Sequence, residues 1–319
     1  MEIRDNFWLK KKVLVTGHTG FKGSWLTLWL KLMGADVLGV SIDPPTKINH
    51  FELINIKKDI ISKKCDIRNS RKLLEIFNHF KPQVVFHLAA QPLVIESYNS
   101  PLETYQTNVI GTLNVLESIR KTSNVRVGIM VTSDKCYENK EQSKGYKEDD
   151  PMGGYDPYSS SKGSCELLIN SYRQSFFNND QKRTIKISSA RSGNVIGGGD
   201  FGKDRLLPDA IYSIVNNKRL KIRNPNSIRP WQHVLEPLGG YINLAKKLYK
   251  KNSSLDQAWN FGPKKSDVKT VEDIVNLFSS KWGHDFKYIL SKSKGPHEAA
   301  LLSLDCSKAK QLMQWQPKW

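Results

Sequence analysis

Short apolar runs alternate with amphipathic segments along the first two thirds of the chain. The runs are continuous and rich in β-branched residues, as in buried strands, and lie at residues 12–17, 36–42, 83–90, 125–133 and 185–197. The segments between them repeat apolar residues at helical spacing, at 23–34, 70–80, 104–121 and 159–176. A short strand end is expected at 63–69. Strands separated by helices predict an α/β fold, a doubly wound parallel sheet with ligand sites at the carboxyl ends of its strands.

From Gly197 onward the pattern becomes irregular, with stretches rich in glycine, proline and asparagine. We therefore expect the sheet to occupy residues 1–190, with residues 230–258 returning to it. Residues 191–229 and 259–319 are expected to form a smaller, loop-rich C-terminal domain laid over the sheet.

The charge balance favours anionic partners. Lys and Arg number 49 against 31 Asp and Glu, a formal net charge of +18, and the basic residues are scattered in pairs and triplets. Scattered basic residues indicate a solvated surface, not the continuous stripe that binds nucleic acid. We expect phosphate-bearing small molecules, and no nucleic acid, as partners.

Cysteine spacing and hydropathy narrow the class of protein further. No C-x-x-C pair and no metal-ligand spacing occurs among the four cysteines, Cys65, Cys136, Cys165 and Cys306. The first residues lack the apolar core of a signal peptide, and charged residues and a glycine interrupt the most apolar stretch, 25–42. We expect a reduced, metal-free protein in the cytoplasm, with no membrane segment.

Three glycines stand where the first predicted strand meets the first predicted helix. Gly17, Gly20 and Gly23 recur at a spacing of three residues. Glycine permits a tight turn and a close approach of the backbone, and the N-terminus of a helix attracts anions. The loop therefore predicts a site for the diphosphate of a dinucleotide in a Rossmann-type sheet, with a purely structural turn as the alternative.

This glycine spacing resembles the short-chain dehydrogenase/reductase superfamily, in particular its extended branch that modifies nucleotide sugars. The sequences CDIR at 65–68 and HLAA at 87–90, followed by Asn108, match that family in order and on the expected elements. The resemblance implies that residues 1–190 bind NAD. The cofactor contacts that it implies are Gly17, Thr19, Gly20, Phe21, Lys22, Gly23, Ser41, Asp66, Ile67, Leu88, Ala89, Ala90, Asn108, Tyr158 and Lys162.

The choice between NAD and NADP depends on the end of the second strand. NAD-dependent relatives often carry an acidic residue there for the ribose diol, whereas this chain has Ser41, with Asp43 two residues later. No arginine follows that would hold a 2′-phosphate, so the pattern favours NAD.

Tyr158 and Lys162 form the Y-x-x-x-K pair of this family. One helical turn separates the two side chains, so the lysine ammonium can lower the pKa of the tyrosine and bind the nicotinamide ribose. Tyr158 is therefore expected to act as a catalytic base. The pair occurs by chance in many helices, but here a strand end with Ser133 precedes it by about two dozen residues, as the family requires.

Asp134 and Lys135 point to dehydration. A reductase or an epimerase needs only a hydroxyl group beside the tyrosine, and Ser133 supplies it. In nucleotide-sugar 4,6-dehydratases, the next two positions usually carry Asp, the acid for the C6 hydroxyl, and Glu, the base for the C5 proton. Here Lys135 replaces the Glu, and it would have to act as a neutral amine. A surface turn is the plainer alternative for these two residues.

With GHTGFKGSWL, YSSSKGSCE and RPWQHVLEPLGGY, the chain resembles the CDP-glucose 4,6-dehydratases from about Phe7 to Trp319. The resemblance implies that Tyr158 removes the 4-hydroxyl proton while NAD accepts the C4 hydride. Lys135 and Asp134 then eliminate water across C5 and C6, and hydride returns to C6. The implied product is CDP-4-keto-6-deoxyglucose, in deoxysugar and surface-polysaccharide biosynthesis.

Residues 191–229 and 259–319 would then bind the CDP-hexose. The substrate contacts implied by the resemblance are Asn194, Arg205, Arg229 and His233. Arginines suit a diphosphate because the planar guanidinium group donates paired hydrogen bonds to phosphate oxygens.

Other activities remain open at this point. Another nucleotide-sugar dehydratase or a 4-epimerase, acting on a GDP- or UDP-sugar, would share the fold, because the residues that recognise the base cannot be read from one sequence. A non-catalytic nucleic-acid-binding protein would explain the charge, but it would leave Tyr158 and Lys162 unexplained and would need clustered stacking aromatics.

The resemblance also bears on assembly and length. The helix at 105–119 carries apolar residues on more than one face, and the resemblance implies that it packs in a homodimer or a dimer of dimers. Relatives generally continue beyond the position of Trp319, so a further C-terminal segment is expected.

Overall fold

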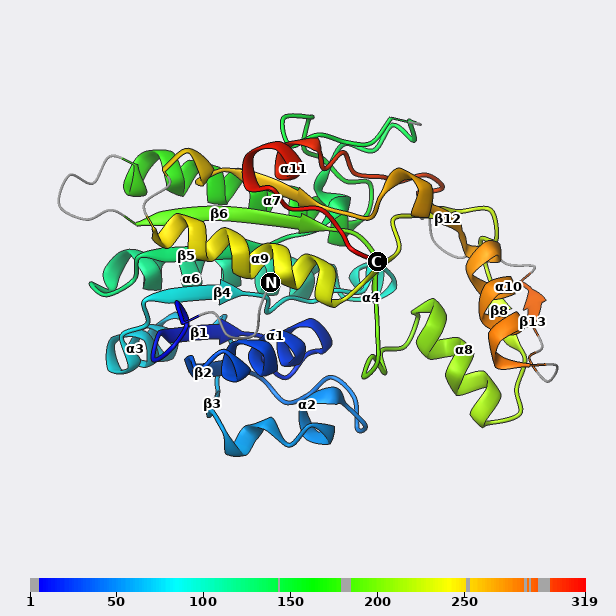
Figure 1. Ribbon diagram of the computed structural model, residues 1–319, viewed down its shortest axis with the longest axis horizontal. Helices are drawn as coiled ribbons and strands as arrows, with labels where there is room; N and C mark the ends of the chain where they lie inside the picture. Colours follow the sequence, from blue (N-terminus) through cyan, green and yellow to red (C-terminus); the bar gives the residue numbers. More distant parts are fainter. Residues whose placement is uncertain are drawn as a thin grey trace.

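A central parallel sheet organises the chain (Figure 1). The computed structural model describes residues 6–142, 144–178, 185–250, 253–283, 286, 288–291 and 299–319. Seven strands lie in the order β11-β6-β5-β4-β1-β2-β3, and every neighbouring pair is parallel. Their bounds are β1 Lys12–Thr16, β2 Asp36–Ser41, β3 Ile61–Lys64, β4 Val84–His87, β5 Val127–Val131, β6 Lys186–Ser192 and β11 Ala258–Phe261. The predicted doubly wound α/β fold is confirmed, and its strand order reverses at β1 and β4, where such sheets bind ligands.

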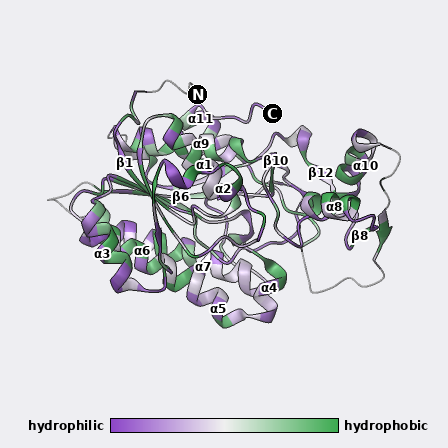
Figure 2. Cartoon of the chain, turned by 90° about the horizontal axis from the view of Figure 1, so that it is seen from below, coloured by the Kyte–Doolittle hydropathy of each residue, from purple (hydrophilic) through white to green (hydrophobic). Residues whose placement is uncertain are grey.

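Helices cover both faces of this sheet (Figure 2). One face carries α1 Phe21–Leu32, α9 Leu235–Tyr249 and α11 Ser307–Met313. The other carries α3 Ser70–Phe80, α6 Gly111–Lys121 and α7 Pro157–Tyr172. Val13 and Val15 of β1 enter the first core and Leu14 enters the second. Because both faces are covered, the central strands β1, β2, β4 and β5 are almost continuous apolar runs, as the sequence pattern predicts. β6 is buried but carries several polar residues, and the edge strand β3 is mostly exposed.

Four predicted elements differ in detail. The strand end expected at 63–69 is β3, which ends at Lys64. The helix expected at 104–121 is divided into α5 Pro101–Tyr105, a π-helical turn Gln106–Ile110 and α6. The segment expected at 159–176 is α7 followed by a second π-helical turn, Arg173–Phe177. The strand expected at 185–197 is β6 and a separate β7 Val195–Ile196, since Gly193 and Asn194 leave the sheet between them.

A smaller group of elements lies beyond the carboxyl end of the sheet (Figure 1). It has its own core, formed by Ala210, Leu220, Ile222, Val275 and Phe286. Its elements are α8 Leu206–Val215, β8 Leu220–Ile222, α10 Val271–Trp282 and β13 Tyr288–Leu290. Two short ladders connect it to the sheet, β7 with β10 Gln232–His233 and β9 Ile228–Arg229 with β12 Lys269–Thr270. Of residues 259–319, β11 and α11 lie with the sheet instead, because their apolar side chains complete its first core.

The remaining short helices are α2 His50–Leu53 and α4 Val94–Asn99, with single 3-10 turns at Ile56–Lys58, Asp134–Cys136, Ser253–Leu255 and Lys265–Asp267. All four cysteine thiols are free, and three of them are buried. Within the described residues, no helix is both long enough and apolar enough to cross a lipid bilayer. The same residues contain no group of three side chains suited to hold a metal ion.

Candidate active site

The loop between β1 and α1 depends on two glycines. Gly17 has a φ of +76°, and a Cβ atom there would lie 2.7 Å from the backbone nitrogen of Ala89. A Cβ atom on Gly23 would lie 2.0 Å from the carbonyl oxygen of Gly17. α1 then begins at Phe21 with no side-chain cap and no acidic residue in its first turn. Its first N–H groups are therefore available to an anion such as the diphosphate of a dinucleotide.

Hydroxyl groups face this loop at the end of β2. Thr19 Oγ1 and Ser41 Oγ lie 2.7 Å apart, and Thr19 also donates a hydrogen bond of 3.3 Å to the carbonyl of Ile42. Asp43 is mostly exposed and forms an ion pair with Lys64. The end of β2, where a ribose is expected to bind, thus offers the hydroxyl groups of Thr19 and Ser41. The nearby acid, Asp43, is paired with Lys64 at the surface.

The other predicted cofactor residues line the same edge of the sheet. Arg68 binds the carboxylate of Asp66 through its backbone N–H at 2.8 Å and its guanidinium group at 2.9 and 2.6 Å. These side-chain hydrogen bonds lower the pKa of Asp66. Ile67 is buried against Gly111, where a Cβ atom would lie 2.4 Å from its Cδ1 atom.

The backbone after β4 is tied to β1. The N–H groups of Leu88 and Ala89 both donate to Thr16 Oγ1 at 3.2 Å, and this oxygen lies 2.7 Å from His87 Nδ1. Leu88, Ala89 and Ala90 are half-buried. The two strands at the reversal point of the sheet are therefore held together next to the glycine loop.

Asn108 lies in the π-helical turn and connects two parts of the site. Its Oδ1 atom accepts a hydrogen bond from the N–H of Gln91 at 2.8 Å. Its Nδ2 atom donates to Ser161 Oγ at 2.9 Å, and Ser161 in turn donates to the carbonyl of Tyr158. Asn108 thus supports the helical turn that carries Tyr158, as well as the segment after β4.

The five predicted catalytic residues come together at the end of β5 and the start of α7. Ser133 caps the turn after β5, accepting from the N–H of Lys135 at 3.2 Å and donating to Asp134 Oδ1 at 3.1 Å. The Nζ atom of Lys162 lies 6.0 Å from the ring centre of Tyr158. Both of these α7 residues are buried.

Burial dominates the titration of these groups. It raises the pKa of Tyr158, and a hydrogen bond with Ser133 and the charge of Arg205 oppose this effect only in part. The direction is opposite to the one that the sequence predicts, and Lys162, whose own pKa is lowered by burial, does not reverse it. Burial also raises the pKa of Asp134 against the nearby positive charges.

The four predicted substrate residues divide into two groups. Arg229 is buried on β9, and its charge lowers the pKa of Asp134, so it faces the catalytic turn. Arg205 precedes α8, donates to both carboxylate oxygens of Asp200 at 2.9 Å, and its charge reaches Tyr158. Asn194 contributes a backbone carbonyl to Gln232, whereas His233 packs edge-on against Trp319 with ring centres 4.9 Å apart.

Lys22 contacts protein groups that the sequence analysis did not anticipate. Its Nζ atom donates to Ser192 Oγ at 2.8 Å and to the hydroxyl of Tyr241 at 3.2 Å. Ser192 ends β6 and Tyr241 belongs to α9, so this lysine joins α1 to both.

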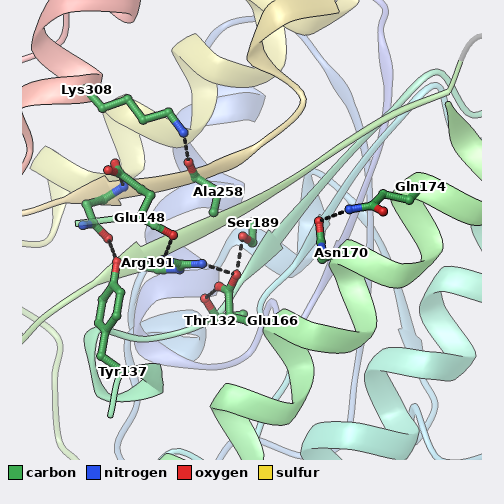
Figure 3. A network of polar contacts seen from close by, with 11 residues as sticks. Thr132, Tyr137, Glu148, Glu166, Asn170, Gln174, Ser189, Arg191, Ala258 and Lys308 are labelled. Carbon is green, nitrogen blue, oxygen red and sulfur yellow. Dashed lines mark hydrogen bonds and ion pairs between the residues drawn. The ribbon is translucent and has the colours of Figure 1, made fainter. Parts of the chain in front are cut away.

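A buried ion pair behind the catalytic helix was also missed by the sequence analysis (Figure 3). Glu166 follows Lys162 by one helical turn and accepts hydrogen bonds from Thr132, from Ser189 at 2.7 Å and from Arg191 at 2.7 Å. Burial raises the pKa of Glu166, but the charge and hydrogen bonds of Arg191 outweigh it, so the pKa lies below its usual value. The sequence contained one signal for this ion pair. Ser189 and Arg191 share one face of a strand, and Lys162 and Glu166 share one face of a helix.

Arg191 extends this network toward the end of the chain. It donates to the hydroxyl of Tyr137 at 2.7 Å and to the carbonyl of Glu148 at 3.0 Å. Tyr137 donates in turn to Asn260 Oδ1 at 2.6 Å. A cavity of 740 Å³ opens beside the network and is lined in part by Glu166, Arg191 and Lys308, but by none of the five predicted catalytic residues.

Comparison with known proteins identifies close relatives. A family model described as GDP-mannose 4,6 dehydratase matches residues 14–319. The chain is 52% identical over 319 positions to the CDP-glucose 4,6-dehydratase of Salmonella typhimurium, covering 99% of this chain and 89% of the relative. It is 25% identical over 338 positions to the dTDP-glucose 4,6-dehydratase of Haemophilus influenzae, covering 96% and 93%.

Solved structures share the fold. The UDP-glucuronic acid 4-epimerase of Bacillus cereus, in complex with UDP-glucuronic acid and NAD, superimposes with a TM-score of 0.82 at 25% identity, covering 97% of this chain and 94% of that one. The dTDP-glucose 4,6-dehydratase of Bacillus anthracis, in complex with NAD, has a TM-score of 0.76 at 21% identity, covering 97% and 92%.

The buried ion pair generates a stability prediction. Glu166→Gln leaves the Arg191 guanidinium without a countercharge, and we expect it to lower the free energy of unfolding by about 3 kcal/mol. Because the pKa of Glu166 is lowered in the folded state, this difference is full above pH 4.5 and is lost as the pH falls below that value. Urea unfolding at several pH values measures it.

The matched control is Glu75→Gln, in the exposed pair of Glu75 with Arg71. It should cost about 0.5 kcal/mol or less. Equal losses for the two variants would contradict a special role for the buried pair.

Proposed function

We propose that this chain, which belongs to the GDP-mannose 4,6-dehydratase family, converts CDP-glucose into CDP-4-keto-6-deoxyglucose with loss of one water molecule. The reaction serves deoxysugar and surface-polysaccharide biosynthesis. The name of the relative that is 52% identical, CDP-glucose 4,6-dehydratase, supports the choice of substrate. The four free thiols are typical of a reducing compartment and support a cytoplasmic location.

A buried carboxyl group beside the tyrosine is the observation that carries this proposal. Asp134 is 3% exposed, and no group in the described part of the chain forms a hydrogen bond with its Oδ2 atom. Because burial raises its pKa, the protonated form is favoured, and that form can protonate a leaving hydroxyl group. Inversion at C4 alone has no such step, so an epimerase has no use for this acid.

The residues present fit NAD as the cofactor. The first turn of α1 and the glycine backbone of the loop suit a diphosphate, and the hydroxyl groups of Thr19 and Ser41 suit a ribose. NAD, when bound, supplies reversible hydride acceptance, taking a hydride from C4 of the sugar and giving it back at C6. The related dehydratase and epimerase structures are both complexes with NAD, which supports the same choice here.

The side chains divide the proton transfers between them. Tyr158 accepts the proton of the 4-hydroxyl group as a phenolate. Burial disfavours this form, whereas the hydrogen bond with Ser133 and the charge of Arg205 favour it. Lys162 lies on the same helix face, with its Nζ atom 6.0 Å from the ring centre of Tyr158. Oxidation at C4 acidifies the C5–H bond, and Lys135 takes this proton at Nζ. The same residue returns a proton to C5 when the hydride adds at C6. The C6–O bond breaks as Asp134 delivers a proton to the leaving hydroxyl, which departs as water. Arg205 and Arg229 bind the diphosphate of the substrate.

Substrate choice and the tyrosine can be tested together. We expect the protein to produce the alkali-induced 4-keto chromophore from CDP-glucose and not from GDP- or UDP-glucose. Tyr158→Phe should lower turnover about a thousand-fold, since it removes the proton acceptor, while bound NAD is retained. Tyr155→Phe is the matched control, because Tyr155 is three residues away and 80% exposed. Near wild-type turnover of Tyr158→Phe would sink the assignment.

Replacing Lys135 tests whether elimination can be blocked while oxidation at C4 continues. In Lys135→Met, the groups that oxidise C4 remain, so reduced cofactor should accumulate while elimination slows about a hundred-fold or more. Substrate deuterated at C5 gives the reading: the wild type should wash the label into solvent and Lys135→Met should retain it. Lys135→Glu should recover part of the elimination, and Lys140→Met, at an exposed lysine, should leave it unchanged. Wash-out from Lys135→Met at the wild-type rate would assign the base to another group.

We also propose that two copies associate through the face formed by α5, the π-helical turn and α7. Apolar side chains are exposed on all three, Leu102 at 71%, Ile110 at 46% and Leu167 at 63%. Large apolar side chains exposed on neighbouring helices are typical of an interaction surface.

Sedimentation velocity tests this association. We expect a dimer at micromolar concentration and a monomer for the double variant Leu102→Asp/Ile110→Asp, because the charges would be buried unpaired. Leu277→Asp, at an exposed leucine of α10, should remain dimeric. A monomeric wild type would contradict the proposed dimer.

A further inference from the structure

Lys22 joins three elements at the edge of the catalytic turn. It lies in the first turn of α1, and its ammonium group donates to Ser192 Oγ at 2.8 Å and to the Tyr241 hydroxyl at 3.2 Å. Tyr241 also donates to Ser192 Oγ at 2.8 Å, and Lys22 Nζ lies 5.3 Å from the tyrosine ring centre. The three groups form a closed triangle, so the position of the ammonium group is fixed relative to the end of β6.

This triangle adjoins the proposed acid. Gly193 follows Ser192, and a Cβ atom on Gly193 would lie 2.8 Å from Asp134 Oδ2. That same oxygen is buried and has no hydrogen-bond partner in the described part of the chain. An ammonium group has three N–H donors, and the triangle uses two of them. Within the described residues, one donor of this ammonium group has no acceptor, and its positive charge acts on the carboxyl group that the elimination requires.

The charges of the two groups act on each other. The negative charge of Asp134 raises the pKa of Lys22, although burial is the larger effect and lowers it to about 8. The positive charge of Lys22 lowers the pKa of Asp134, opposing the burial that raises it.

Other groups also face Asp134, and they either act on its titration or respond to its charge. They come from its own turn, from β9, from α7 and from α9, and are Ser133, Lys135, Cys136, Arg229, Tyr158 and Tyr241. Arg205 and Lys162 face Lys22 in the same way. Lys22 is the charge that α1 contributes to this set.

We propose that Lys22 is a positioning residue for the elimination step, holding the end of β6 beside Asp134 and supplying a positive charge on the α1 side of that carboxyl group. This inference rests on the proposed function, since it assigns Asp134 as the acid. The resemblance implies that Lys22 contacts the cofactor, whereas here Lys22 controls the acid Asp134. The charge limits how strongly Asp134 holds its proton, so that the proton can pass to the leaving hydroxyl group.

A direct titration of Asp134 tests the charge without relying on activity. Aspartate labelled with ¹³C at the side-chain carboxyl is titrated by NMR in the wild-type protein, and Asp134→Asn identifies the signal. Lys22→Met and Lys22→Gln remove the charge, and the glutamine retains hydrogen-bonding capacity in case the methionine variant does not fold. Both should raise the pKa of Asp134 by about half a unit to one unit, since an opposite charge nearby favours the ionised carboxylate.

Two further variants separate charge from structure. Tyr241→Phe removes one hydrogen bond of the triangle but keeps the ammonium group, so the Asp134 titration should stay near that of the wild type. Lys31→Met removes a lysine from the last turn of the same helix and should leave both titration and turnover unchanged. An unshifted Asp134 in both Lys22 variants, or an equal shift in Tyr241→Phe, would overturn the proposal.

The rate of the elimination step completes the test in the NAD-loaded enzyme with CDP-glucose. Lys22→Met should move the alkaline limb of 4-keto product formation upward by the same half unit to one unit, because Asp134 then keeps its proton to higher pH. In the Asp134→Asn background, Lys22→Met should have no further effect, since the charge has no carboxyl group left to act on. A fall in rate with no movement of the limb would assign Lys22 a merely structural role and reject the inference. Absence of product from the wild type would contradict the proposed function, and the NMR titration would still decide the role of Lys22.

Discussion

The ion pair between Glu166 and Arg191 is the interaction on which the rest of the site depends. Both side chains are less than 5% exposed. A charge buried this deeply is tolerated only with its partner in place, so the pair forces α7 and β6 into one arrangement. Glu166 also accepts from Thr132, the residue before Ser133, and it follows Lys162 by one helical turn. The same carboxylate thus locates the hydroxyl group and the helix face that the chemistry uses.

Burial has a second effect on the same region, because it sets the proton affinity of each reacting group. The pKa values of Tyr158 and Asp134 are raised, whereas those of Lys22 and Lys162 are lowered. Each shift favours the neutral form of its group. Where several acids and bases are buried together, small changes in nearby charge decide which group holds a proton. Positive charges placed around Asp134 from different elements are therefore a means of control.

The fold, and the positions of the site residues that belong to sequence motifs, could be predicted from the sequence. The alternation of strand and helix patterns predicted the parallel sheet, and the glycine loop and the Tyr158 and Lys162 pair were located on the correct elements. It could not predict contacts that join residues far apart, such as Glu166 with Thr132 or Lys22 with Ser192, because periodicity assigns a face but not the partner opposite it. The pKa of Tyr158 was predicted in the wrong direction for a related reason: helical spacing shows that Lys162 is near, but not that burial outweighs it.

The bond from Tyr137 to Asn260 has a consequence for how the chain acquires its structure during synthesis. It joins residues 123 positions apart, and it completes the set of groups around Arg191. β11, which carries Asn260, adds the last strand next to β6. The ribosome therefore releases most of the nucleotide-binding layers before the edge of the sheet can close over this arginine. Contacts so distant along the chain form slowly. Until β11 is added, the edge of β6 is unpaired and the groups around Arg191 are incomplete. Partly folded chains with unpaired strand edges are the species that chaperones bind.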